Sequence, residues 1–124
     1  MDCFADVPDV YRRVGRLIEN TLADPVFGET LASVDAIVQY QLRAPASTIT
    51  IDARAGRAPV VICGDCDLEP EIVLRADAEV AELLWERELD VTIALARAEL
   101  SATGPVEKLL EAVAAARRCA KVAG

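Results

Sequence analysis

The sequence predicts an α+β fold in which a five-stranded, mainly antiparallel sheet is covered on one face by helices. Short segments that alternate apolar and polar residues follow one another between residues 36 and 75, with turn residues between them. Segments with helical spacing of apolar residues lie before and after this block. One further β-type segment, Glu99–Thr103, stands alone between helical segments and is expected to complete the sheet.

The first 34 residues are expected to form helices. Asp6 and Pro8 are typical of a helix start, because Asp caps free backbone N–H groups and Pro needs none in the first turn. The helical stripe that follows is Val10, Val14, Leu17, Ile18 and Leu22. Asp24-Pro25 ends this helix, and a short second helix is expected up to Val34.

Four strands are expected in residues 35–76, each marked by β-type alternation or by a short apolar run. They are Ala36–Leu42, Thr48–Asp52, Val60–Cys63 and Glu71–Arg75. Short links and half-apolar faces favour an antiparallel meander. Residues 35–76 are therefore predicted to form a four-stranded meander.

Residues 77–124 are predicted to supply a helix pair, the edge strand and a closing helix. The pair covers Ala78–Arg87 and Asp90–Ala96, with Asp at each start, and Gly104-Pro105 opens the closing helix after the strand. The length of 124 residues fits one domain over 1–124.

Composition excludes several classes of function. The net charge of −8 repels phosphate backbones and anionic headgroups, so neither nucleic acid nor a stable membrane anchor is expected. No run of apolar residues is long enough to span a membrane, and the acidic N-terminus is unlike a secretory signal, so a cytoplasmic location is expected. Basic residues that are almost all arginine, with abundant Ala and Val, suggest a bacterial, GC-rich genome.

Reactive chemistry is sparse, because the chain contains no histidine. Cys63-Gly-Asp-Cys66 could bind zinc or cycle as a dithiol, but zinc needs about four ligands and a redox pair usually lies at a helix N-terminus. The favoured interpretation is a buried Cys63 and a Cys66 in a turn. We therefore predict no catalytic residue, no metal and no cofactor.

Two segments resemble the sterol carrier protein type-2 family. AELLWERELDVTIALARAEL is similar to the stretch where that family has a helix, a turn, a second short helix and the start of the last strand. ELSATGPVEKLLEAV is similar to its last strand, glycine turn and closing helix. The resemblance extends over roughly Leu31 to Ala116, and it departs at Arg87 and near Ala98, where the family often has glycine.

The resemblance implies an apolar tunnel between the sheet and the helices, which takes sterols, fatty acids or fatty acyl-CoA. Trp85 is expected either to pack in the core or to line a pocket entrance, and Tyr40 could be a polar anchor. The expected ligand-binding residues are Val38, Tyr40, Ile49, Ile51, Ile72, Leu74, Leu83, Leu84, Val91, Leu95, Leu109 and Val113.

The first hypothesis is therefore the binding and transfer of a hydrophobic ligand, such as a fatty acid, a fatty acyl-CoA or a sterol- or isoprenoid-like lipid, without covalent chemistry. The alternatives are a non-catalytic accessory or dimerisation module, with a homodimer or a protein partner left open, and a cofactor-free enzyme acting on a hydrophobic metabolite. An exposed apolar strip on Glu99–Thr103 would favour the module. A buried carboxylate facing the cavity would favour the enzyme.

Overall fold

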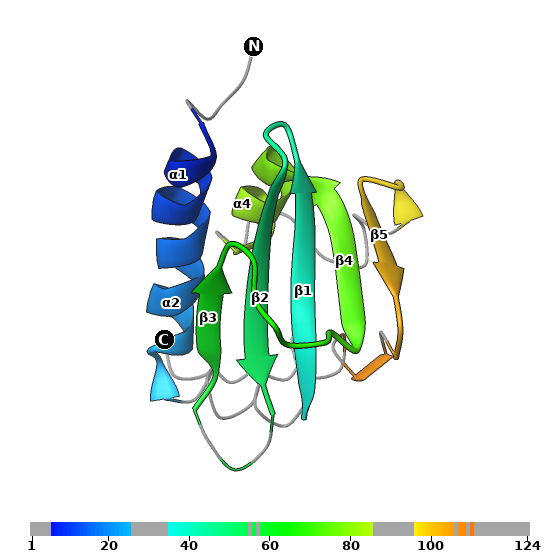
Figure 1. Ribbon diagram of the computed structural model, residues 1–124. Coiled ribbons are helices and arrows are strands. Elements are labelled where there is room, and N and C mark those ends of the chain that lie inside the picture. The colour runs from blue at the N-terminus through cyan, green and yellow to red at the C-terminus, as the bar shows by residue number, and fades with distance from the viewer. Residues whose placement is uncertain are drawn as a thin grey trace.

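A computed structural model of the chain describes residues 6–25, 35–54, 56, 58–85, 96–105, 107–108 and 110. In this part a five-stranded sheet carries helices against one of its faces (Figure 1). The predicted α+β class is confirmed. The expected second helix up to Val34, most of the expected helix Asp90–Ala96 and most of the closing helix lie outside the described residues.

The N-terminal helical run begins as the sequence predicts. It consists of α1 (Val7–Val10), the π-helical η1 (Tyr11–Gly15) and α2 (Arg16–Leu22). Asp6 is the N-cap, and its side chain accepts a hydrogen bond from the backbone N–H of Asp9 at 2.9 Å. Three positions of the predicted stripe are fully buried and face the sheet: Val10, Val14 and Ile18.

The five strands lie within two residues of their predicted bounds. They are β1 (Ala36–Arg43), β2 (Ser47–Ala53), β3 (Val60–Cys63), β4 (Ile72–Asp77) and β5 (Leu100–Thr103). The helix α4 (Ala78–Trp85) follows β4 directly. The order across the sheet is β3-β2-β1-β4-β5, which places β3 and β5 at the edges.

The predicted meander is wrong at its fourth strand. β4 pairs with β1 in parallel, with Tyr40 opposite Leu74, while all other pairs are antiparallel. A parallel pairing needs a crossover, and the link 64–71 supplies it by running across the face that the helices leave open (Figure 1). Glu71 N–H donates to Ile37 O at 2.9 Å where this link ends. The sheet is therefore mixed, though mostly antiparallel.

The two faces of the sheet differ in chemistry. The face toward the helices carries the buried aliphatic residues of the core. On the other face a chain of polar contacts crosses four strands: Gln39 donates to Thr50, Gln41 to Gln39, and Arg75 to both Gln41 and Thr103. This division by alternation explains why the helices cover one face only.

Ala98 lies at one of the positions where the chain departs from the glycine of the family that it resembles. Its φ is 58°, so the backbone keeps a left-handed conformation that favours glycine. Because an L-residue pays roughly 1–2 kcal/mol there, we expect Ala98→Gly to raise the free energy of unfolding by about 0.5–1 kcal/mol. Urea unfolding checks this, and a lower stability would contradict it.

Candidate functional site

The sheet residues predicted to bind ligand meet on the face toward the helices. Two rows run across β2, β1 and β4 in register, one through Ile51, Val38 and Ile72 and the other through Ile49, Tyr40 and Leu74. All of these side chains are buried, at 6% exposure or less. The predicted set from the sheet is therefore brought together as one apolar surface.

The residues predicted to face them from the helices are only partly described. Leu83 lies on α4 and is half-buried, and the side chain of Leu84 on the same helix is not among those described. Val91, Leu95, Leu109 and Val113 lie outside the described residues. The expectation that these residues close a tunnel over the sheet stays a prediction.

Tyr40 and Trp85 form an aromatic pair at the centre of this layer. Their ring centroids lie 6.4 Å apart at an interplanar angle of 67°, an edge-to-face arrangement. Trp85 is half-buried at the end of α4 and packs against the core. The contact fixes α4 on β1, and it makes Trp85, the chain's one tryptophan, a reporter of events beneath that helix.

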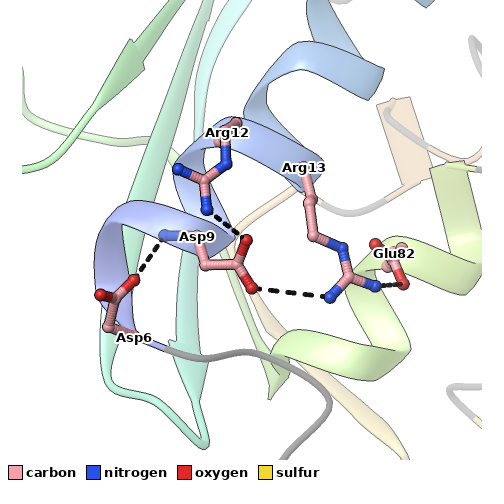
Figure 2. A network of polar contacts seen from close by, with 5 residues as sticks. All are labelled: Asp6, Asp9, Arg12, Arg13 and Glu82. Carbon is pink, nitrogen blue, oxygen red and sulfur yellow. Dashed lines mark hydrogen bonds and ion pairs between the residues drawn. The ribbon is translucent and has the colours of Figure 1, made fainter.

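A network of charges fastens the N-terminal helical run to α4 (Figure 2). Arg13 lies between two carboxylates, with N–O distances of 2.9 Å to Glu82 and 3.7 Å to Asp9. Arg12 also donates to Asp9, at 2.7 Å. Arg13 thus links two elements of the helical cover that are far apart in the sequence.

An open hollow of about 410 Å³ lies between α2 and β3, and we call it the α2–β3 hollow. Its lining is mostly apolar: Glu19, Leu22, Ala23, Ala58, Pro59, Val60 and Val61. It is an open depression in the surface rather than an enclosed cavity. The sequence analysis did not predict this hollow. The one feature of the sequence that points to it is the apolar run Val60–Cys63, which forms an edge strand of the sheet.

The two thiols of the Cys63–Cys66 motif lie on opposite faces of the sheet. Cys63 is in register with Ile49, and its Sγ lies 2.8 Å from where a Cβ atom on Gly15 would be, so it faces the helices. The Sγ of Cys66 donates to Thr50 Oγ1 at 3.4 Å, on the open face. This placement supports neither shared metal binding nor dithiol cycling by the pair. Cys66 lies in the link after β3, but Cys63 is exposed, so the prediction that Cys63 is buried is wrong.

The reactivity of Cys63 offers a test of its surroundings. Although the residue as a whole is exposed, its Sγ lies against Gly15, and this partial desolvation raises the pKa of the Cys63 thiol; the negative charge of Glu19 raises it further. Glu19→Gln should lower this pKa, so that more thiolate is present at a given pH and iodoacetamide alkylates Cys63 faster. The acceleration should be smaller than the one that unfolding causes, because burial is the larger cause of the raised pKa. Peptide mass spectrometry measures the rate. An unchanged rate in Glu19→Gln, or an equal acceleration in the control Glu79→Gln, would contradict this assignment.

The described residues contain one buried carboxylate, and it does not face the helices. Asp52 is 5% exposed and accepts from Arg54 Nε at 2.8 Å and from Nη2 at 2.7 Å. It pairs across the sheet with Ile37 and Val60, on the face opposite the apolar rows. The enzyme alternative required a carboxylate facing the cavity, and none is found in this part of the chain.

The described ranges hold neither a metal-binding cluster nor a membrane-spanning helix. No group of three or more His, Cys, Asp or Glu side chains is placed there to hold a metal ion. None of the helices found there has the length and apolar character needed to cross a bilayer.

Comparison with known proteins establishes the fold. No family model matches the sequence, and no curated protein matches it. Solved structures of sterol carrier protein 2 domains from several organisms do match, at low sequence identity. The solution structure of the sterol carrier protein domain 2 of Helicoverpa armigera has a TM-score of 0.68 at 17% identity, covering 86% of this chain and 87% of that one.

Two other matches show the settings in which this fold occurs. A structure of the UbiJ-SCP2 ubiquinone synthesis protein has a TM-score of 0.66 at 17% identity, over 89% of this chain and 95% of that one. The stereoselective inverting sec-alkylsulfatase Pisa1 from Pseudomonas sp. has a TM-score of 0.59 at 15% identity, over 70% of this chain but 14% of that one. The fold of sterol carrier protein 2 thus occurs both as a separate domain and as a small part of an enzyme.

Proposed function

We propose that this chain binds a hydrophobic small molecule of the lipid class and transfers it without covalent chemistry. The observation that carries the proposal is the sterol carrier protein 2 fold, combined with two in-register rows of apolar side chains beneath a helical cover. Fatty acids, fatty acyl-CoA and sterol- or isoprenoid-like lipids are the candidate ligands. Val38, Tyr40, Ile51 and their row neighbours would form the sheet side of the binding layer.

Energetics are compatible with a carrier. Burying a methylene group contributes about 0.8 kcal/mol, so a long aliphatic chain gains on the order of 10 kcal/mol before costs. Lost translational and rotational freedom offsets several kcal/mol of that gain. Affinity in the micromolar range follows, which suits exchange between donor and acceptor better than storage.

The proposal is tested by transfer of an uncharged fluorescent lipid between vesicle populations, with the protein added at catalytic amounts. We expect transfer to accelerate in proportion to protein concentration and Trp85 emission to change as lipid binds, since Trp85 packs on Tyr40 in the proposed layer. Boiled protein serves as the control. Unaltered transfer together with unaltered Trp85 emission would refute the carrier role.

The accessory-module alternative is favoured by one comparison and disfavoured by one observation. The alkylsulfatase match shows the fold as a small part of a larger enzyme, which is the setting that a module would have. On β5, however, Leu100 is buried and the exposed residues, Ser101 and Thr103, are polar. The apolar strip that would mark a partner surface there is not found on the described strand, so we rank the carrier first.

A further inference from the structure

The α2–β3 hollow exposes apolar surface at a position where the sheet ends. Val61, whose side chain is on the helix face of β3, is half-buried, and Val60 at the rim of the hollow is 48% exposed but is in register with Asp52 on the open face. Leu22 and Pro59 beside it are half-buried. A ligand that covers these side chains removes apolar surface from water, which is the driving force for binding an aliphatic chain.

The electrostatics of the hollow restrict the head group of that ligand. Glu19 is the only ionisable residue among those that line it. In the described part of the chain, none of the ion pairs neutralises Glu19. The net charge of −8 adds to the local negative potential. A carboxylate or phosphate head placed here would be repelled, whereas a hydroxyl or an ammonium group would donate a hydrogen bond to Glu19.

The orientation of Glu19 has independent support. Glu19 is four residues after Gly15, so both lie on the same side of the helical run, and Gly15 contacts Cys63 of β3. The charge of Glu19 also raises the pKa of the Cys63 thiol, as expected for a carboxylate on the side of the helical run near β3. Glu19 therefore faces the hollow from the helix side.

We propose that the α2–β3 hollow binds the aliphatic chain of an amphiphile whose head group is uncharged or cationic, and that Glu19 selects this head group against anionic ones. This inference rests on the proposed function, and it concerns the hollow at the edge strand rather than the layer formed by Val38, Tyr40 and Ile51. It disfavours free fatty acids and acyl-CoA at this site and favours long-chain alcohols and amines.

Isothermal titration calorimetry with dodecanol, dodecylamine and dodecanoate tests the inference, because the three share one chain and differ in head charge. We expect dodecylamine and dodecanol to bind about tenfold more tightly than dodecanoate, from the Coulomb energy of a charge pair at a partly exposed site. Glu19→Gln should reduce this preference to within about threefold, and Glu19→Lys should invert it. Glu19 is exposed, so both variants are expected to fold.

Glu79→Gln is the matched control, since it removes one negative charge from an exposed helical position outside the hollow. It should leave the preference unchanged. Tighter binding of dodecanoate, or a preference that survives Glu19→Gln, would overturn the head-group inference while leaving lipid binding intact. Failure of all three ligands to bind would overturn the inference, and it would overturn the proposed function as well if vesicle transfer also fails.

Discussion

Gly104→Ala is expected to lower the free energy of unfolding by about 3 kcal/mol, the largest loss that we predict for a single added methyl group. Gly104 has a φ of 99°, in the left-handed region that costs an L-residue roughly 1–2 kcal/mol. A Cβ atom there would also collide with the carbonyl oxygen of Glu71, which is backbone and cannot rotate away. Urea unfolding measures the loss, and the melting temperature should fall by about 10 °C.

Gly64→Ala is the matched control for that experiment. Gly64 has a φ of 95°, but no atom lies within 4 Å of the position that its Cβ would take. We expect a loss of about 1 kcal/mol, from backbone strain alone. Equal losses in Gly64→Ala and Gly104→Ala would contradict the close approach of the β5 turn to the start of β4.

Ile49→Ala is expected to cost about 2–5 kcal/mol, the usual range for truncating a buried aliphatic side chain. Ile49 is fully buried on β2, between Tyr40 and Cys63 in its row. Its removal sacrifices apolar burial and leaves a cavity in a close-packed layer. Denaturant unfolding monitored by circular dichroism gives the value.

The comparison for Ile49 is Val60→Ala on the neighbouring edge strand. Val60 is 48% exposed, so its truncation should cost about 0.5 kcal/mol or less. A cost below about 1 kcal/mol for Ile49→Ala would mean that its side chain borders empty space rather than packed atoms. The two losses in unfolding free energy together therefore show whether the layer between the sheet and the helices is packed with side chains around Ile49 or contains empty space there.

Local sequence signals predicted most of the described elements and failed at the one crossover. Alternation located β1, β2 and β4 to within two residues, because period-two patterning reflects a buried face and an open face directly, and a short apolar run located β3. The partner of β4 could not be predicted in this way. The sequence of residues 64–71 is typical of a short connection between neighbouring antiparallel strands. Only the tertiary structure shows that these residues cross the sheet and place Leu74 beside Tyr40.

The candidate site was likewise predicted only in part. Tyr40, Ile49 and their row neighbours were predicted as one apolar surface, because residues on one face of a sheet share a pattern in the sequence. The α2–β3 hollow was missed, since it joins the end of a helix to an edge strand far along the chain. Cys63 and Cys66 illustrate the same limit, because the two thiols are close in the sequence but lie on opposite faces of the sheet.

Native mass spectrometry of the protein purified without detergent, followed by organic extraction of anything bound, tests lipid binding most directly. We predict a population whose mass exceeds that of the chain by one lipid, and an extract that contains a molecule with an aliphatic chain and an uncharged or cationic head group. A fatty acid or an acyl-CoA in the extract would preserve the carrier role, and the head-group preference of the Glu19→Gln variant would then decide whether the α2–β3 hollow selects its ligand. The mass of the chain alone, with no uptake of an uncharged fluorescent lipid, would contradict the carrier role itself.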